Sequence, residues 1–435
     1  MKILMLGWEY PPHISGGLGT ACEGLTRALA RSGGCQITFI VPCLFGGEQA
    51  PHMHILDAFE IALWNRKRRG QEGNLDSDLL RTLRVPALLK PYLDADEYQT
   101  SLSQLASSAG QESAGLLAKL RNRRRSGQYG KDIFAEVMRY AKALAPLAEH
   151  LEFDLIHAHD WMTYPAGIEL AKRSGKPLLV HVHSLETDRS GPGVDRRIHQ
   201  IEAMGVTRAD AVIAVSHYTR SIINKVHRVP LPKIFVVHNG IYPNSIKEHY
   251  RKSIGADRRV VLFLGRVTYQ KGPEFFVEAA ARVVPRLPEA RFILAGSGDM
   301  LPRVAQRVNE LGMRNNFAFT GFLRGTQVER AFALADLYVM PSVSEPFGIS
   351  ALEAINFDTP ALISRQSGVA EVLHHAMKFD YWDIDRLADL IYNGLLYDEL
   401  RYDMIEMART ELQKLRWDQA AQKTMRIYQL FLRPQ

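Results

Sequence analysis

The sequence KILMLG, residues 2–7, opens the chain with a short and almost continuously apolar run. A loop follows it, and TACEGLTRALARSG, residues 20–33, then repeats apolar residues at helical spacing. A short apolar run of this kind is typical of a strand that is buried on both faces of a parallel sheet. The opening stretch therefore predicts one β–α unit: a buried strand, a loop and a helix.

The β–α unit recurs along the chain in two series. The first series has further β-rich runs at residues 36–42, 154–160, 177–183 and 211–216. After a loop-like stretch at residues 236–256, a second series has runs at residues 259–266, 290–296, 317–322, 336–342 and 360–364. Repeated β–α units predict an α/β fold with two doubly wound, Rossmann-like parallel sheets. Ligands of such sheets bind at the carboxyl ends of the strands, so two facing sheets would share one cleft.

The length of the chain also favours two domains, because 435 residues exceed the size of one ordinary core. We predict an N-terminal domain at residues 1–240, a C-terminal domain at residues 241–415 and a final helix at residues 416–435. That tail is amphipathic and carries large or apolar residues at helical spacing: Trp417, Ala421, Met425, Tyr428 and Leu432.

A polar insert at about residues 60–130 holds much of the positive charge. The formal net charge of the chain is +7, and the insert contains RKRR at residues 66–69 and RNRRR at residues 121–125. A solvated surface is the simplest interpretation of such clusters. No zinc-finger, RRM or homeodomain pattern accompanies them, so we predict no nucleic-acid partner, while peripheral contact with an anionic membrane stays open. We expect the insert to govern the choice of acceptor or partner rather than catalysis.

Targeting and redox signals are weak. No apolar run approaches 18 residues, and the N-terminus lacks the apolar region of a signal peptide. The three cysteines lack CxxC spacing, which argues against a disulfide framework and against zinc. We therefore predict a cytoplasmic protein without a transmembrane segment, and the sequence leaves its oligomeric state open.

A glycine-rich loop, HISGGLG at residues 13–19, follows the first predicted strand. Gly16, Gly17 and Gly19 would let the backbone approach a ligand, and the next helix would offer its unpaired N–H groups to an anion. The spacing fits neither the dinucleotide fingerprint GxGxxG nor a Walker loop. A tight turn without a ligand is the alternative.

A second motif, LGRVTYQKGPE at residues 264–274, follows the first strand of the second series. Arg266 and Lys271 stand beside Gly265 and Gly272. A diphosphate suits this combination, because the guanidinium makes bidentate contacts and the ammonium supplies a compact charge. Two solvated surface cations are the alternative interpretation.

Two histidine motifs, HAHDW at residues 157–161 and HVHSLE at residues 181–186, also stand at predicted strand ends. Alternation along a strand places both histidines of a pair on one face. Without HExxH or a carboxylate at zinc-ligand spacing, we predict no metal site. A structural role for each histidine stays open. From these motifs we select His159, Asp160, His183 and Glu186 as candidate site residues.

The last motif is PSVSEPFGISALEA, residues 341–354, in which two glutamates bracket the start of a predicted helix. Amides from Gly348 onward would point at a phosphate. Glu345 and Glu353 are eight residues apart, about 12 Å at the rise of a helix, which is near the span from hexose to ribose in a nucleotide sugar. Phe347, Gly348 and Ile349 complete this candidate donor site. The alternative is a loop carboxylate beside a helix dipole and a second carboxylate on the helix surface.

These motifs together resemble a known family. EPFGISALE matches the E-x7-E signature of retaining glycosyltransferases with the GT-B fold, in which two Rossmann-like domains face a cleft. With WEYPPHISGGLG, HAHDW, GRVTYQKG and FTGFL in the same order, the chain resembles family-4 glycosyltransferases, particularly those similar to glycogen synthase. The resemblance covers nearly the whole chain except about residues 60–130.

The resemblance implies a role for each candidate in binding the donor. By similarity to the family, Glu345 contacts the donor sugar and Glu353 the ribose hydroxyls. Arg266 and Lys271 bind the donor diphosphate.

It also implies a catalytic role for His159 and roles on the acceptor side, for which the candidates are Asp160, His183 and Glu186. Gly16 and Gly17 would contact the phosphate and the acceptor, and His159 would lie by the reacting sugar, partly through its backbone carbonyl. In the family the last helix crosses back onto the first domain.

The implied activity is retaining transfer of a hexose from a nucleotide-diphosphate sugar to a glycan or other hydroxyl acceptor, with no cofactor and no essential metal. One departure concerns the donor. Bacterial glycogen synthases that use ADP-glucose carry K-x-G-G, whereas here His13, Ile14 and Ser15 precede Gly16. The sequence therefore leaves open the donor base (uridine, adenosine or guanosine), the sugar (glucose by similarity) and the acceptor.

Three alternatives remain at this point. A GT-B phosphorylase or epimerase would share the fold, although no segment identifies a pyridoxal-phosphate lysine. A non-catalytic protein could bind the sugar nucleotide without turnover. A metal-dependent transferase would need Asp-x-Asp after a buried strand; that spacing occurs at Asp76/Asp78, Asp94/Asp96 and Asp383/Asp385, in no such context.

Overall fold

The computed structural model describes residues 1–14, 16–44, 46–58, 61, 132–242 and 259–432. The two arginine clusters of the polar insert and the first two Asp-x-Asp pairs lie outside these ranges. The chain forms two compact units, one of residues 1–182, 200–213 and 424–435, the other of residues 183–199 and 214–423. The predicted domain boundaries stay predictions.

The first sheet has seven strands in the order β3-β2-β1-β4-β5-β6-β7. β1 pairs in parallel with both β2 and β4. The strand order therefore reverses between β1 and β4, as in a doubly wound fold. The strands are β1 Lys2–Leu6, β2 Gln36–Val41, β3 His54–Asp57, β4 Leu155–His159, β5 Leu178–Val182, β6 Ala211–Ala214 and β7 Ile234–Val236.

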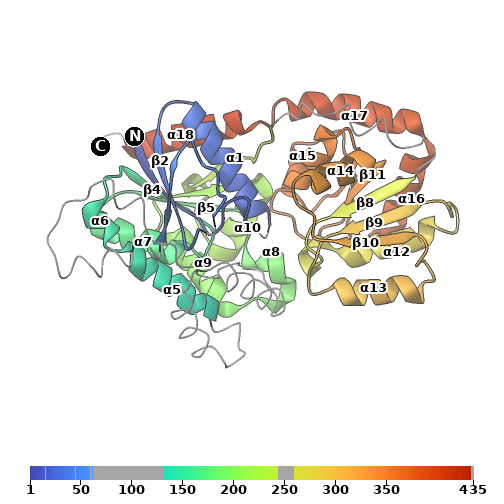
Figure 1. The fold of residues 1–435 in the computed structure, drawn as a ribbon, viewed down its shortest axis with the longest axis horizontal. Coiled ribbons are helices and arrows are strands. Elements are labelled where there is room, and N and C mark those ends of the chain that lie inside the picture. Colours follow the sequence, from blue (N-terminus) through green and yellow to red (C-terminus); the bar gives the residue numbers. More distant parts are fainter. Residues whose placement is uncertain (15, 45, 59–60, 62–131, 243–258, 433–435) are drawn as a thin grey trace. The chain divides into compact units, whose positions relative to one another are not determined.

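Helices connect these strands, as Figure 1 shows for the blue and green parts of the ribbon. They are α1 Gly17–Arg31, α5 Asp132–Leu144, α6 Leu147–His150, α7 Tyr164–Ser174, α8 Glu186–Ser190, α9 Arg196–Arg208 and α10 His217–His227, with the 3-10 turns η3 Gly191–Gly193 and η4 Leu231–Lys233.

The second sheet has six strands in the order β10-β9-β8-β11-β12-β13, and it reverses between β8 and β11. Its strands are β8 Val260–Leu264, β9 Arg291–Ala295, β10 Phe317–Gly321, β11 Leu337–Met340, β12 Ala361–Ser364 and β13 Met377–Phe379. The helices are α12 Pro273–Val283, α13 Leu301–Glu310, α14 Thr326–Leu334, α15 Ile349–Asn356, α16 Ile384–Leu396, α17 Asp398–Leu412 and α18 Trp417–Leu432, with η5 Tyr269–Lys271 and η6 Gly368–Glu371.

Side-chain alternation along the second sheet builds two cores, one on each face. In β8, Val261 and Phe263 join the core under α12, α13 and α16, whereas Leu262 joins the core under α14 and α15. Figure 1 shows α12 and α13 on one side of this sheet and α14 and α15 on the other. Burial on both faces explains why the central strands β8 and β11 read as continuous apolar runs.

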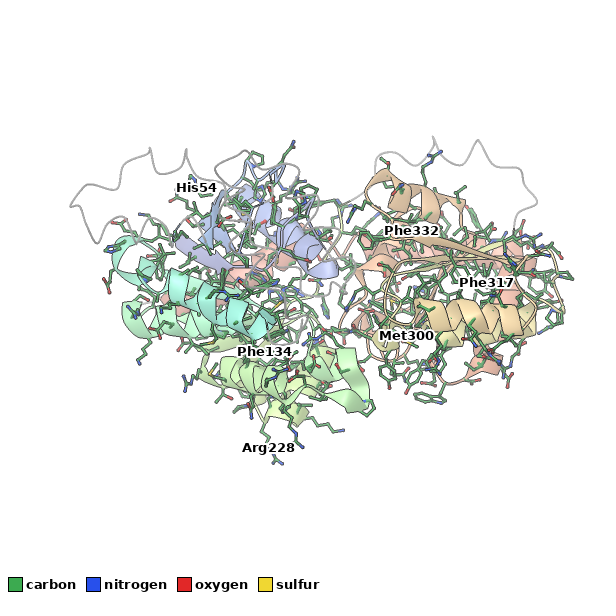
Figure 2. All side chains as sticks on the ribbon, turned by 60° about the horizontal axis from the view of Figure 1, so that its bottom comes forward. His54, Phe134, Arg228, Met300, Phe317 and Phe332 are labelled. Carbon is green, nitrogen blue, oxygen red and sulfur yellow. The ribbon has the colours of Figure 1, made fainter. Side chains whose placement is uncertain are left out.

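Three side chains labelled in Figure 2 belong to these cores. Phe332 is fully buried in the core under α14 and α15. Met300 and Phe317 pack against the other core. Phe317 also stacks on Phe292, with ring centroids 5.3 Å apart.

The predicted fold class is confirmed: every apolar run predicted as a strand contains one, within two residues at either end. The amphipathic tail forms α18, Trp417–Leu432, whereas the predicted segment bounds of 416–435 stay a prediction. Three strands were missed, β3, β7 and β13, because they have only three or four residues and lie at sheet edges. Runs of that length carry too little periodicity to separate them from loops.

Candidate active site

The candidate site of the second unit lies where its strand order reverses. The loop after β8 carries Lys271 and the loop after β11 carries Glu345, and the two side chains form an ion pair. Glu345 is 6% exposed and Lys271 is half-buried. Two motifs 74 residues apart therefore meet at one point, and this is the point at which doubly wound sheets bind their ligands.

Three hydrogen bonds hold Glu345 in place. Its backbone N–H donates to the carbonyl of Gln366 and its own carbonyl accepts from the N–H of Gly368, each at 2.9 Å. The Ser342 hydroxyl donates to the carboxylate at 3.2 Å. Gln366 and Gly368 follow β12, so three loops at this edge of the sheet meet around one carboxylate.

The loop after β8 is shaped by its glycines. Gly272 has φ +62°, and a Cβ there would lie 2.2 Å from the carbonyl oxygen of Pro341, so the loop needs glycine. Gly265 lies against the side chain of Lys271, where a Cβ would make an ordinary contact at 3.8 Å. Arg266 is half-buried and donates to Gln270 Oε1 at 3.0 Å.

The N-terminus of α15 is suited to an anion. Gly348 precedes the helix with φ +106°, and no side chain of the described residues caps the first turn. The first amides of a helix lack partners within the helix, and they favour negative charge. Phe347 is buried, and its carbonyl accepts from Val369 N–H at 2.6 Å, which fixes the chain just before this end. Ile349 is the first residue of the helix.

Glu353 lies on the second turn of α15 and is half-buried. Burial raises its pKa to about 7. Among the described residues no cation pairs with Glu353, and a carboxylate whose pKa is raised by burial is a frequent feature of binding sites.

Replacing Glu353 by Gln should stabilise the protein at high pH. The folded-state pKa lies above the ordinary value of 4.5, so wild-type stability is fully present below pH 4.5 and falls as pH rises through 7. The amide stays neutral throughout. We expect Glu353→Gln to gain about 2 kcal/mol over wild type at pH 8 and almost nothing at pH 4.5, measured by urea unfolding.

The exposed Glu399 of α17 provides a control. Glu399→Gln should change the unfolding midpoint little at either pH. An advantage of Glu353→Gln that does not grow with pH would contradict the assigned pKa.

In the first unit, the predicted glycines stand at the reversal point of the first sheet. α1 begins at Gly17, three residues earlier than predicted, and Gly16 is its N-cap in an extended conformation. No described atom lies within 4 Å of a Cβ built on either glycine. Packing within the described residues therefore does not require glycine at these two positions. Close approach of a ligand to the backbone would require it.

His159 ends β4, on the other side of the same reversal point. Its ring is fully buried, and its carbonyl accepts from the Thr163 hydroxyl at 3.0 Å. Asp160 follows with φ +59°, a left-handed conformation that is uncommon for non-glycine residues and is found at functional sites. The Asp160 N–H donates to the carbonyl of His181 at 2.9 Å.

His157, His159 and His181 form a buried cluster. As alternation predicts, His157 and His159 share a face of β4, and their ring centroids are 4.2 Å apart. The three side chains each have a nitrogen within 4.8 Å of the others, so they could hold a metal ion. His157 Nδ1 also contacts the hydroxyl of Tyr428 in α18 at 2.6 Å. The absence of an essential metal stays a prediction.

The acceptor-side candidates of HVHSLE lie in the second unit. His183 is half-buried, and desolvation lowers its pKa below the ordinary value, so it is neutral at pH 7. Glu186 is buried and accepts from Arg189 Nε at 3.1 Å and from the Ser190 hydroxyl at 2.6 Å. These bonds hold α8 together; contact of either residue with an acceptor stays a prediction.

Sequence reasoning missed a third glycine loop, AGSGD at residues 295–299, after β9. Gly296 has φ +152°, and a Cβ there would lie 1.8 Å from the carbonyl oxygen of Gly265. Gly298 has φ +157° and would bring a Cβ 2.3 Å from the carbonyl oxygen of Val267. The two loops thus pack backbone against backbone. Two glycines directly after a predicted strand were the available signal.

Asp383 and Asp385, one of the Asp-x-Asp pairs, have structural partners. Asp383 caps α16 by accepting from the Arg386 N–H at 3.0 Å, and Asp385 pairs with Arg282 at 2.6 Å.

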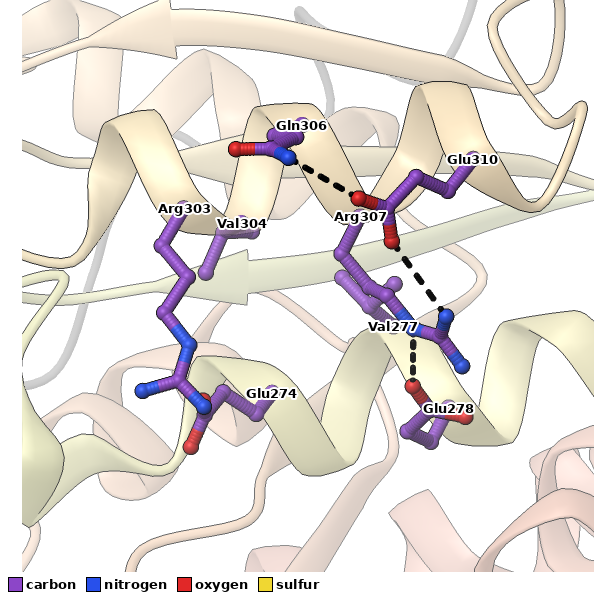
Figure 3. A pocket seen from close by; sticks show the side chains of 8 residues that line it. All are labelled: Glu274, Val277, Glu278, Arg303, Val304, Gln306, Arg307 and Glu310. Carbon is purple, nitrogen blue, oxygen red and sulfur yellow. Dashed lines mark hydrogen bonds and ion pairs between the residues drawn. The ribbon is translucent and has the colours of Figure 1, made fainter.

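A separate hollow of about 410 Å³ lies between α12 and α13 (Figure 3). Arg307 pairs with Glu278 at 2.6 Å and Arg303 with Glu274 at 2.9 Å. With Glu310, the lining has three carboxylates and two guanidiniums, so it has no excess positive charge to attract a diphosphate. This hollow is therefore a poor candidate for a diphosphate, and the donor site at the strand ends stays a prediction.

Two family profiles match the chain. The profile described as Glycosyl transferases group 1 matches residues 245–411, and Glycosyltransferase Family 4 matches residues 92–245. Among the described residues, no helix has the length and apolar character needed to cross a membrane.

Three curated relatives extend this similarity. An uncharacterised glycosyltransferase of Methanocaldococcus jannaschii is 28% identical over 99% of this chain and 98% of its own length. Glycogen synthase of Mycobacterium tuberculosis is 26% identical over 86% of this chain and 80% of its own. α-Maltose-1-phosphate synthase of Mycolicibacterium smegmatis is 30% identical over 63% of this chain and 78% of its own.

A solved structure supports the fold. Sucrose-phosphate synthase from Thermosynechococcus elongatus superposes with a TM-score of 0.72 at 18% identity, covering 99% of this chain and 98% of that one. The two profile matches follow one another along the chain, and each falls on one of the doubly wound sheets. The chain therefore belongs to the family-4 glycosyltransferases of the GT-B fold and is a glycosyltransferase.

Proposed function

We propose that this glycosyltransferase moves glucose, with retention of configuration, from a nucleoside-diphosphate glucose to a glycan or other hydroxyl acceptor. The observation that carries the proposal is the Lys271–Glu345 ion pair at the reversal point of the second sheet, beside the uncapped start of α15. Lys271 and the start of α15 suit a diphosphate, and Glu345 suits a sugar hydroxyl.

The cations would act on the leaving group. As the bond between sugar and phosphate breaks, the two phosphates gain negative charge. Arg266, Lys271 and the first amides of α15 would stabilise that charge more in the transition state than in the ground state. Lys271 would exchange its contact with Glu345 for the diphosphate, which frees the carboxylate to accept a sugar hydroxyl.

Glu345 and Glu353 would hold the two ends of the donor. We assign Glu345 to the glucose and Glu353 to the ribose hydroxyls. Retaining glycosidases use carboxylates about 5 Å apart as acid and nucleophile on one sugar, whereas we assign Glu345 and Glu353 to opposite ends of the donor. A double displacement on this pair is therefore not proposed. Attack by the acceptor on the same face of the sugar, with the leaving phosphate taking its proton, fits the residues better.

The residues at the reversal point of the first sheet are assigned to the same reaction. Gly16 and Gly17 leave room beside the helix amides of α1, which suits the phosphate and the acceptor. His159 contributes its backbone carbonyl to the reacting sugar. Two relatives are named glycogen synthase and α-maltose-1-phosphate synthase, and these names support glucose as the sugar transferred.

A donor panel tests the proposal. The purified protein is given uridine-, adenosine- and guanosine-diphosphate sugars with maltooligosaccharide acceptors, and the products are identified by mass and by NMR. We expect one glucose donor to be used and an α-linked product. Activity should survive EDTA, because Arg266 and Lys271 supply the positive charge that a metal clamp would.

The same panel distinguishes the alternatives. Release of glucose 1-phosphate from glycan and inorganic phosphate would indicate a phosphorylase, and binding without turnover would indicate a sugar-nucleotide-binding protein. A β-linked product, or activity that EDTA removes and manganese restores, would overturn the proposed mechanism.

A further inference from the structure

The hydroxyl of Ser344, next to Glu345 in the chain, is held between two side chains from distant segments. It donates to Asp188 Oδ1 at 2.5 Å, and it lies 3.0 Å from the Tyr218 hydroxyl. A serine hydroxyl has one proton, so Tyr218 is the donor in the second bond. Burial raises the pKa of Tyr218, which therefore keeps its proton.

The Asp188 side chain is buried and forms part of the N-terminal cap of α8. It is 1% exposed, and its second oxygen accepts from the N–H of Leu185 at 2.8 Å, which caps the helix. Withdrawing a carboxylate from water is costly unless it is hydrogen-bonded. The Ser344 hydroxyl is thus one of the donors that stabilise the buried Asp188 carboxylate.

The residue on the other side of Glu345 is held in the same way. The carbonyl of Pro346 accepts from the hydroxyls of Ser216 at 2.6 Å and Thr219 at 3.1 Å. Gly368 packs here so closely that a Cβ would lie 2.2 Å from the Pro346 oxygen. Both neighbours of Glu345 are therefore fixed by side chains of residues 188–219.

The start of α10, which supplies three of these groups, is itself anchored. The Glu371 carboxylate accepts from the N–H of His217 at 2.8 Å and of Tyr218 at 3.2 Å, and it contacts His238 Nε2 at 2.5 Å. Burial would raise the pKa of Glu371, but these contacts outweigh it and the pKa lies below its ordinary value. The Tyr218 side chain thus projects from a rigid point.

We propose that Asp188 and Tyr218, acting through Ser344, are positioning residues that hold Glu345 in the orientation needed for turnover. The proposal rests on the proposed function, in which Glu345 contacts the donor sugar. α8 also carries Glu186, a predicted acceptor-side residue. The Asp188–Ser344 hydrogen bond therefore links α8 to the loop that carries Glu345, which we assign to the donor sugar.

The decisive variant is Ser344→Ala, which removes both hydrogen bonds and leaves the backbone unchanged. We expect kcat for transfer to fall about tenfold, as for loss of a hydrogen bond to a charged group. The affinity for the nucleoside diphosphate, measured by calorimetry, should stay within about twofold, because that part of the donor contacts Arg266 and Lys271. Ser344→Thr keeps the hydroxyl and should restore most of the rate.

Two further variants separate positioning from general damage. Ser221 lies on α10, and its exposed hydroxyl donates to the Tyr218 carbonyl of the same helix at 2.7 Å. Ser221→Ala should therefore leave kcat unchanged. Tyr218→Phe should lower kcat in the wild type and add little in the Ser344→Ala background, because both changes break one network.

Hydrogen exchange supplies a readout that needs no turnover. Relative to wild type and Ser221→Ala, the Ser344→Ala protein should exchange faster at the amides of Glu345, Gly368 and Val369, which hold this loop to the next. Unchanged exchange at these amides would overturn the positioning proposal, even if no donor is ever turned over. Failure of the wild type with every donor would overturn only the proposed function. Faster exchange with an unchanged kcat would overturn the link to catalysis.

Discussion

Replacing Lys271 by Ala should lower kcat/KM for the donor about 100-fold while the protein stays folded. A charge-assisted hydrogen bond is worth about 1.5–3 kcal/mol, and the upper end of that range corresponds to this change in rate. In wild type, the ammonium of Lys271 lies against Glu345 at the reversal point of the second sheet. Its loss removes positive charge from the leaving diphosphate and leaves a buried carboxylate without its cation.

A comparison of steady-state kinetics and thermal unfolding tests this expectation. Arg303 is the matched control, because it is also a cation of the second unit in an ion pair, but it lines the hollow between α12 and α13. Arg303→Ala should leave kcat/KM within about twofold of wild type. Arg266→Ala should resemble Lys271→Ala. Near-wild-type kinetics for both Arg266→Ala and Lys271→Ala would remove these residues from the site.

The second large effect is expected from Gly296→Ala, at the loop that sequence reasoning missed. The new Cβ would overlap the carbonyl oxygen of Gly265 at 1.8 Å, and φ of +152° is unfavourable for alanine in any case. Backbone cannot move aside as a flexible side chain can. We expect a loss of about 4 kcal/mol in the free energy of unfolding and weaker donor binding, because Gly265 adjoins Arg266.

Gly312→Ala is the control for the backbone conformation alone. Gly312 has φ +70°, but no described atom lies within 4 Å of its Cβ position. This variant should lose about 1 kcal/mol and keep its affinity for the donor. Equal losses for Gly296→Ala and Gly312→Ala would mean that the backbone contact between the two loops has little energetic weight.

Much of the site could be predicted because its motifs stand directly after buried strands. A strand buried on both faces is mostly apolar, so the runs ending at Leu6, Leu264 and Met340 were visible without any contact being known. Polar and glycine-rich residues after such runs fall at one edge of a parallel sheet. Placing Lys271 and Glu345 at the same edge followed from that rule alone.

The partners of those residues could not be predicted, because they come from segments without a local signal. Ser344 is an ordinary loop serine in the sequence, and Asp188 lies in a helix of five residues. Their hydrogen bond joins positions 156 residues apart. Likewise, nothing in the sequence distinguishes Gly296 from other loop glycines. Only the structure shows that the carbonyl of Gly265 packs against it.

The amino-acid sequence by itself determined the two doubly wound sheets, the strand ends that hold the motifs and the family to which the chain belongs. Those properties depend on periodicity and on residue types within short windows, which the chain carries locally. Only the tertiary structure decided that Lys271 pairs with Glu345, that burial raises the pKa of Glu353 to about 7, and that Asp188 and Tyr218 meet at Ser344. Such contacts and degrees of burial arise when distant loops are brought to one sheet edge, so no local pattern encodes them.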